Sequence, residues 1–128
     1  MNGELNRRLL LCLAALMVLL IVTGAIGLFR AMENRLTVEN RSGQAVSLLT
    51  VEVVDGNSRH GLISQSLPDN GLATASFSVS ADGYFHLVGA FTDGTPIEEK
   101  SCGYVTNGDF GERVRFTIKP GGAVDFAD

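Results

Sequence analysis

The residues from Leu9 to Phe29, LLLCLAALMVLLIVTGAIGLF, determine how the rest of this chain is organised. The stretch has 21 residues and no charged side chain. As an α-helix that rises about 1.5 Å per residue it would extend roughly 31 Å, which matches the hydrocarbon thickness of a bilayer. We therefore expect residues 9–29 to form a transmembrane helix and the remaining chain to lie on one side of the membrane.

The flanks of this stretch indicate how it is inserted. Arg7 and Arg8 precede it, as in the n-region of a secretory signal or a signal anchor. The apolar run is longer than a cleaved signal requires, which favours an uncleaved anchor. Arg30, Arg35 and Arg41 follow it closely, so the charges alone do not settle the orientation, and the β-structured domain that follows favours residues 1–8 in the cytoplasm. Cleavage near Thr23-Gly24-Ala25 is the alternative, because these small residues follow an apolar core of suitable length.

Three small residues recur every four positions in and just after this stretch, at Thr23, Gly27 and Ala31. Residues at that spacing share one helix face, and small side chains there let two membrane helices approach closely. Weak homodimerisation through this face is a second hypothesis for the anchor.

The chain after the anchor is acidic. From Asn34 onward it has seven Lys or Arg residues and twelve Asp or Glu residues, a net charge of −5. This balance argues against nucleic acid and against an anionic membrane surface as partners, since both attract basic proteins. The only cysteines are Cys12 and Cys102, and the first lies in the membrane stretch, so no disulfide is expected within the domain. We expect Cys102 to be a buried apolar side chain, with an intermolecular link as the alternative.

The hydrophobic pattern changes from continuous to alternating at Leu36. Residues 30–35, RAMENR, are mostly polar and predict a short juxtamembrane link. Over residues 36–128, short apolar alternations are broken by turn residues every 8–12 positions, which predicts seven or eight strands. This spacing is typical of a small antiparallel immunoglobulin-like β-sandwich, so we predict an all-β domain behind one transmembrane helix. A small barrel is the alternative.

The clearest hairpin is centred on Asp93-Gly94, a two-residue signal for a type I′ turn between residues 83–92 and 95–105. In that register the facing pairs are Thr92–Thr95, Val88–Glu99, His86–Ser101 and Phe85–Cys102. Alternation of inward and outward side chains then assigns a set of residues to the core. This set includes Phe77, Phe85, Leu87, Val114 and Phe116.

The sequence contains no specific motif for catalysis or metal binding. His60 and His86 have no histidine or cysteine at metal-ligand spacing, and the Asp-Gly pairs fit turns better than calcium loops. The sequence has no G-x-S-x-G nucleophile motif. We therefore expect no catalytic site, no bound metal and no cofactor, and an enzyme is the most distant of the alternatives.

One segment resembles a binding loop. Residues 103–111 place two aromatic side chains among glycines and small polar residues, a mixture in which rigid rings supply contact area. The candidate partner-binding residues are Tyr104, Thr106, Asn107, Asp109 and Phe110. The alternative is an ordinary long turn whose two rings pack into the core. We expect the acidic turns at Asp82 and Asp93 to lie outside the contact.

Four features together carry a resemblance to a known kind of protein. They are the Arg7-Arg8 anchor, the opening LTVENRSGQAV, the strand ADGYFHLVG and the loop CGYVTNGDFGER. With these features the chain resembles small single-pass inner-membrane proteins of Gram-negative bacteria that carry a periplasmic β-sandwich. The resemblance implies a C-terminal domain in the periplasm, and some proteins of that kind are effector–immunity proteins. Assembly factors of terminal oxidases also combine an anchor with an immunoglobulin-like domain, but this chain lacks their paired metal-binding cysteines.

These observations favour a membrane-anchored periplasmic module for protein–protein interaction. The specific hypothesis is an immunity protein that neutralises a toxin. An accessory or assembly subunit of an envelope complex is the alternative.

Overall fold

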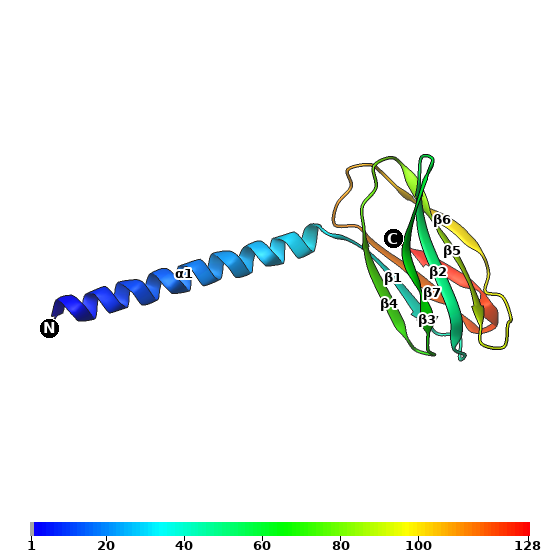
Figure 1. Ribbon diagram of the computed structural model, residues 1–128, viewed down its shortest axis with the longest axis horizontal. Coiled ribbons are helices and arrows are strands. Elements are labelled where there is room, and N and C mark those ends of the chain that lie inside the picture. Colours follow the sequence, from blue (N-terminus) through cyan, green and yellow to red (C-terminus); the bar gives the residue numbers. More distant parts are fainter. Residues whose placement is uncertain (1) are drawn as a thin grey trace. The chain divides into compact units, whose positions relative to one another are not determined.

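The computed structural model describes residues 2–128 and has two parts, a helix that ends at Met32 and a strand-built domain, Glu33–Asp128 (Figure 1). The helix α1 spans Asn2–Met32. Within it, Asn6–Met32 is long and apolar enough to cross a membrane. The Thr23 hydroxyl donates to the carbonyl oxygen of Leu19 at 2.9 Å, so this polar group is satisfied inside its own helix. The prediction of a long apolar helix is confirmed.

The predicted polar link at residues 30–35 is not a separate segment. Arg30 to Met32 complete α1, and the first strand already begins at Asn34. Glu33 alone separates the two elements along the chain. Composition predicted a link because four of these six residues are polar, but polar residues also suit a helix end and an exposed strand face.

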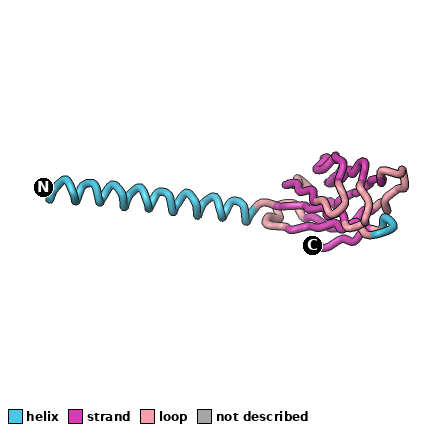
Figure 2. Tube along the Cα trace, turned by 90° about the horizontal axis from the view of Figure 1, so that it is seen from below, coloured by secondary structure: helices cyan, strands magenta, loops and turns pink. Residues whose placement is uncertain are grey.

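The domain contains eight strands and one 3-10 turn. In chain order they are β1 (Asn34–Asn40), β2 (Val46–Asp55), β3 (Ser58–Leu67), β4 (Leu72–Phe77), β5 (Gly83–Phe91), β6 (Lys100–Val105), β7 (Arg113–Ile118), η1 (Pro120–Gly122) and β8 (Val124–Ala127). Figure 2 shows the strands in magenta and η1 as a short cyan segment among them. The number of strands agrees with the turn spacing of the sequence.

The strands form two four-stranded sheets that stack as a sandwich. The first sheet has the order β4-β1-β7-β8 and the second the order β3-β2-β5-β6. Neighbouring strands are antiparallel, except that β1 and β7 run parallel. The sandwich is therefore observed, rather than a small closed barrel.

The core lies between the two sheets and follows the predicted alternation. Phe85 on β5 is fully buried, and its ring centroid lies 5.0 Å from that of Phe77 on β4, in an edge-to-face arrangement. Phe85 also lies 6.3 Å from Phe116 on β7, so it joins the second sheet to the first. Leu87 and Val114 are buried beside them. The inward assignment of these five side chains is confirmed, and Cys102 packs partly buried against the same core.

The hairpin between β5 and β6 differs from the prediction at its tip. The body keeps the predicted register, with Phe85 opposite Cys102 and His86 opposite Ser101. At the tip, Gly94 N–H donates to the Phe91 carbonyl at 3.0 Å and Phe91 N–H donates to the Thr95 carbonyl at 2.9 Å. Gly94 has φ 85°, whereas Asn70 is the one non-glycine residue with positive φ in the described chain. This is a three-residue type I loop with a glycine bulge, because a type I′ turn needs positive φ at Asp93 too.

The glycine bulge shifts the register near the tip, so the predicted Thr92–Thr95 and Val88–Glu99 pairs do not form. An isolated bridge joins Ala90 to Pro96 instead. The Ile97 N–H still donates to the Gly89 carbonyl at 2.9 Å, and the chain then leaves the sheet until β6 begins at Lys100. The excursion buries Ile97 in the core.

Candidate functional site

The candidate loop, residues 103–111, begins inside β6 at a glycine bulge. Gly103 has φ 76°, and a Cβ at this position would lie 2.5 Å from the Phe126 ring and 3.1 Å from the Phe85 ring. Only glycine fits such a position without moving the core. The bulge adds one residue to β6 opposite β5, since the pairing changes between Gly83–Val105 and Phe85–Cys102. It directs Tyr104 outward while Val105 remains buried.

Asp82, in the turn before β5, holds the start of the loop. The Tyr104 hydroxyl donates to Asp82 Oδ2 at 2.6 Å, and the backbone N–H of Asn107 donates to Asp82 Oδ1 at 3.0 Å. The hydrogen bond from Tyr104, followed by that from Asn107, holds the pKa of Asp82 below its usual value. The same hydrogen bond to the carboxylate raises the pKa of Tyr104. Asp82, which we expected to lie outside the partner contact, therefore orders two of the candidate residues.

A tight turn shapes the tip of the loop. The backbone N–H of Asp109 donates to the Thr106 carbonyl at 3.1 Å, and Asp109 Oδ2 accepts from the Thr106 N–H at 3.2 Å. Gly108 inside this turn has φ 89°, which suits glycine. The turn satisfies its own polar groups, so its geometry does not depend on a partner.

A buried asparagine from the first strand secures the far side of the loop. Asn34 is 6% exposed. Its Nδ2 donates to the Asp109 carbonyl at 3.0 Å, and its Oδ1 accepts from the Glu112 N–H at 3.1 Å. Sequence reasoning missed this residue, because 75 positions separate it from Asp109 and no local pattern links them.

The loop presents both aromatic rings to solvent. Tyr104 is 71% exposed and Phe110 is 66% exposed. The alternative in which these rings pack into the core is therefore wrong. Thr106, Asn107 and Asp109 are exposed as well. The structure thus brings all five predicted residues onto one exposed loop that internal hydrogen bonds keep in shape.

A second polar cluster, which the sequence did not reveal, surrounds Asp55 at the end of β2. Asp55 is 3% exposed, and its Oδ2 accepts from the backbone N–H and the hydroxyl of Ser80 at 2.9 and 3.1 Å. The backbone hydrogen bond from Ser80 is the main cause that lowers the pKa of Asp55. Its Oδ1 lies 3.1 Å from His60 Nε2, but outside good hydrogen-bond geometry. This cluster ties the end of β2 to the segment before β5.

The second histidine takes part in a cross-strand contact. His86 Nδ1 lies 2.8 Å from the Ser101 hydroxyl, and its Nε2 lies 3.5 Å from a carboxylate oxygen of Glu99. The register that pairs β5 with β6 places His86 directly opposite Ser101, so strand pairing alone accounts for the contact. Among residues 2–128, no group of three or more His, Cys, Asp or Glu side chains has an arrangement suited to a metal ion.

Comparisons with known proteins give little further information. No protein-family model and no curated protein sequence matches the chain. A protein from Eubacterium rectale, solved by NMR, is 12% identical with a TM-score of 0.43, over 75% of this chain and 87% of that chain. A structure described as a trapped toxin is 10% identical with a TM-score of 0.44, over 74% of this chain and 23% of that chain.

A third similar chain comes from the structure of a disulfide-locked mutant of intermedilysin with human CD59. It is 11% identical with a TM-score of 0.40, over 75% of this chain and 24% of that chain. This protein therefore spans about a quarter of the last two chains. Likenesses of this size assign neither a family nor a function.

Proposed function

We propose that this protein is a membrane-anchored module for protein–protein interaction, in which α1 is the anchor and the 103–111 loop contacts a protein partner. The observation that carries the proposal is the exposure of Tyr104 and Phe110 on a loop that Asp82 and Asn34 hold in place. Rigid, exposed aromatic rings lose little conformational freedom on binding, and aromatic side chains dominate the energy of many interfaces.

The anchor supports the membrane part of the proposal. The stretch Asn6–Met32 is long and apolar enough to cross a bilayer, and Arg7 and Arg8 lie at its start. In our proposal the helix is an uncleaved signal anchor in the inner membrane of a Gram-negative bacterium. The domain then lies in the periplasm, as the resemblance described above implies.

The strand order supports an immunoglobulin-like interpretation of the domain. In variable-type immunoglobulin domains one sheet contains strands G, F, C and C′, and the other contains the pair B and E. The order β6-β5-β2-β3 follows the first series, and the antiparallel pair β1 and β4 takes the place of B and E. The strand β7 lies beside β1, where strand A would pair with B, but it runs parallel to β1, whereas the strands of the immunoglobulin sheets are antiparallel.

The most specific version of the proposal is that the partner is a toxin, which this protein neutralises at the membrane. Genetics separates this version from a role in an envelope complex. An immunity protein is dispensable unless the cognate toxin gene is present, and its deletion then becomes lethal. Deletion of an envelope-complex subunit produces a defect without any toxin gene.

The contact is tested by affinity capture of the full chain from detergent-solubilised membranes. We expect Tyr104→Ala and Phe110→Ala each to reduce capture of the partner at least about tenfold, as hot-spot aromatics do. Leu72→Ala is the matched control, because Leu72 is 61% exposed on β4 and lies outside the loop. Thermal unfolding of each variant is measured in parallel.

Two results would contradict the proposed contact. The first is loss of capture in Leu72→Ala while both loop variants bind normally, which would place the interface elsewhere on the sandwich. The second is a large fall in melting temperature for Tyr104→Ala or Phe110→Ala, which would mean that the ring stabilises the domain rather than a partner.

A further inference from the structure

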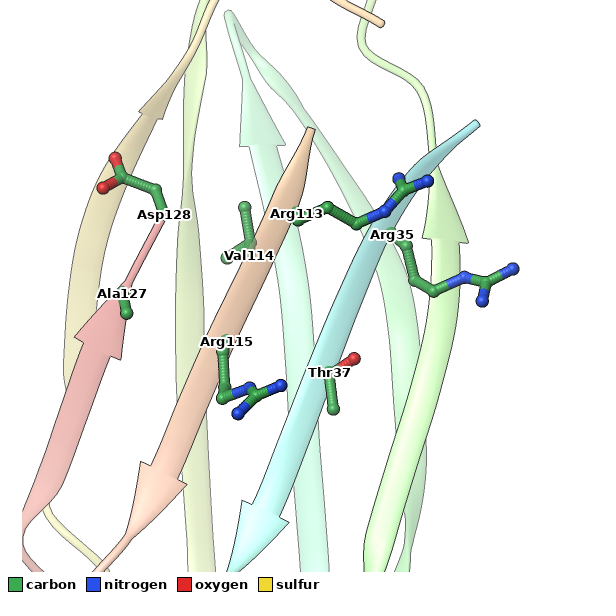
Figure 3. Close-up of a pocket in the computed structure, with 7 residues that line it drawn as sticks. All are labelled: Arg35, Thr37, Arg113, Val114, Arg115, Ala127 and Asp128. Atoms are coloured by element: carbon green, nitrogen blue, oxygen red, sulfur yellow. The ribbon is translucent and has the colours of Figure 1, made fainter. Parts of the chain in front are cut away.

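The two outer faces of the sandwich differ in chemistry. On the first sheet, strands β1 and β7 carry charged and hydroxyl side chains on this face, and Figure 3 shows four of them, Arg35, Thr37, Arg113 and Arg115. On the second sheet, the outward positions of strands β2 and β5 hold mainly apolar side chains. They are Leu48, Val54, Tyr84, Val88 and Ala90. We call these five side chains the apolar face, since the buried residues of the same strands point the other way, into the core.

Strand pairing groups the members of the apolar face into one surface. Leu48 lies opposite Ala90, and Val54 lies opposite Tyr84. Leu48 is 54% exposed and Tyr84 is 39% exposed. An outer sheet face that meets only water is normally polar, as the first sheet illustrates, whereas grouped apolar side chains on a surface are typical of an interface.

The apolar face is continuous with the 103–111 loop. The pairing of β5 with β6 changes register on either side of Tyr84, at the bulge that contains Gly103. Tyr84 therefore lies opposite this bulge, which directs Tyr104 outward. The two tyrosines are cross-strand neighbours on the outer side of the sheet. One surface thus extends from the aromatic loop along β5 and β2.

The net negative charge of the domain belongs to the half that carries this surface. Residues 46–67 and 82–111 contain the second sheet and the aromatic loop, and they have seven Asp or Glu residues and two Lys or Arg residues, a net charge of −5. Residues 34–45, 68–81 and 112–128 have five of each kind and no net charge. Both basic residues of the acidic half are already in ion pairs, Arg59 with Glu52 at 3.2 Å and Lys100 with Glu98 at 3.7 Å.

Three further carboxylates of this half lie at the rim of the surface. Asp82 accepts a hydrogen bond from the Tyr104 hydroxyl at 2.6 Å, and Asp109 belongs to the loop itself. Glu99 lies 3.5 Å from Nε2 of His86, on the outer side of β5, and its side chain is 69% exposed. An apolar and aromatic centre with a carboxylate rim is complementary to a surface that exposes Arg or Lys side chains, because the faces of aromatic rings also attract cations.

We propose, building on the protein contact proposed above and depending on it, that the apolar face and the 103–111 loop form one contact surface and that the protein partner places a basic surface on it. The apolar side chains contribute buried area at the centre. The carboxylates increase the rate of association and favour a basic partner over an acidic one.

The test uses the full chain, labelled with ¹⁵N, in micelles of a zwitterionic phosphocholine detergent. The probe is a synthetic peptide of four Gly-Arg-Ser repeats, and a peptide of four Gly-Gln-Ser repeats is its neutral control. Two-dimensional NMR follows each backbone amide as peptide is added. We expect the arginine peptide to shift the amides of Tyr84, Tyr104 and Glu99. It should leave those of Thr37 and Thr117, on the first sheet, unchanged, and the glutamine peptide should shift neither set.

Matched variants separate the surface from the net charge. Tyr84→Leu keeps an apolar side chain but removes the ring, and Glu99→Gln removes one negative charge. Each should raise the dissociation constant of the arginine peptide about threefold. Asp125→Asn is the control, because it removes one negative charge from an exposed position on the first sheet. It should leave the dissociation constant unchanged.

Three results would overturn the proposal. They are equal shifts on the two sheet faces, equal shifts with the two peptides, and an unchanged dissociation constant in both Tyr84→Leu and Glu99→Gln. None of them concerns the loop contact, which is judged by affinity capture. Failure of the loop contact has a different signature, normal capture by both Tyr104→Ala and Phe110→Ala, and it would also remove the basis for a basic partner at this surface.

Discussion

Asn40, at the end of β1, offers a sharp test of how the two turns at one end of the sandwich are held together. The side chain is completely buried. Its Nδ2 donates to the backbone carbonyls of Gln44 at 2.7 Å, Pro68 at 3.0 Å and Leu67 at 3.3 Å. Its Oδ1 accepts from the N–H and the hydroxyl of Ser42 at 3.1 and 2.6 Å. One amide thus connects the β1–β2 turn to the β3–β4 turn.

The substitution Asn40→Asp keeps the shape of the side chain but removes its N–H donors. No cavity forms, so the energy change reports the polar contacts. An Asn side chain has two N–H groups, and losing a buried hydrogen bond while its acceptor stays unsatisfied costs about 1–3 kcal/mol. A carboxylate oxygen would also face carbonyl oxygens in a buried site. We expect Asn40→Asp to lower the free energy of unfolding by about 3–5 kcal/mol at neutral pH, a large part of the total for a domain of this size.

The loss should depend on pH, and its sign follows from burial. Burial and the facing carbonyl oxygens would raise the pKa of the introduced carboxyl in the folded state above its unfolded value of about 3.9. The folded state then binds the proton more tightly than the unfolded state. The destabilisation relative to the parent protein should therefore be smallest below about pH 3.9 and should grow as pH rises through the higher folded value.

The measurement is urea unfolding of the full chain in detergent, followed by near-ultraviolet circular dichroism over a range of pH. Asn57→Asp is the matched control, because Asn57 is exposed in the β2–β3 turn. A loss below about 1 kcal/mol for Asn40→Asp at neutral pH, or a loss that does not vary with pH, would refute the role assigned to this amide.

Further predictions concern the core and the loop. Phe85→Ala should lower the free energy of unfolding, measured by chemical denaturation, by about 3–5 kcal/mol. Thr74→Ala on the outer face should change it by less than about 0.5 kcal/mol. Equal effects would mean that the inward and outward faces of the strands are wrongly assigned. Gly103→Ala should cost about 1–3 kcal/mol, because its Cβ would overlap the core at a positive φ; an unchanged melting temperature would contradict the bulge. Because hydrogen bonds lower the pKa of Asp82 in the folded state, its hold on the loop persists above the unfolded value of about 3.9 and is lost as pH falls through the lower folded value. The protection factor of the Asn107 amide against hydrogen exchange should fall over that range in the parent protein but not in Asp82→Asn, and the same profile in both would contradict this.

Local patterns predicted much of the fold, because period-two alternation needs only neighbouring residues. The alternation in residues 113–119 assigned Val114 and Phe116 to the core, and the body of the β5–β6 hairpin kept the register expected from Asp93-Gly94. The turn type predicted for the tip of that hairpin was wrong, since an Asp-Gly pair also suits a type I turn with a glycine bulge. Both turns accept the same Asp-Gly pair, so the local sequence does not distinguish them.

The sequence by itself determined the apolar helix, the number of strands, the inward faces and the position of the aromatic loop. These features follow from the order of apolar, polar and turn residues along the chain. The tertiary structure decided which distant residues meet. It placed Asn34 and Asp82 against the aromatic loop, Asn40 between two turns, and Arg35 beside Arg113 on the parallel strands β1 and β7 (Figure 3). The physical reason is that hydrogen bonds and charges act over a few ångströms of space, whatever the separation in the chain, and only the pairing of the sheets sets those distances.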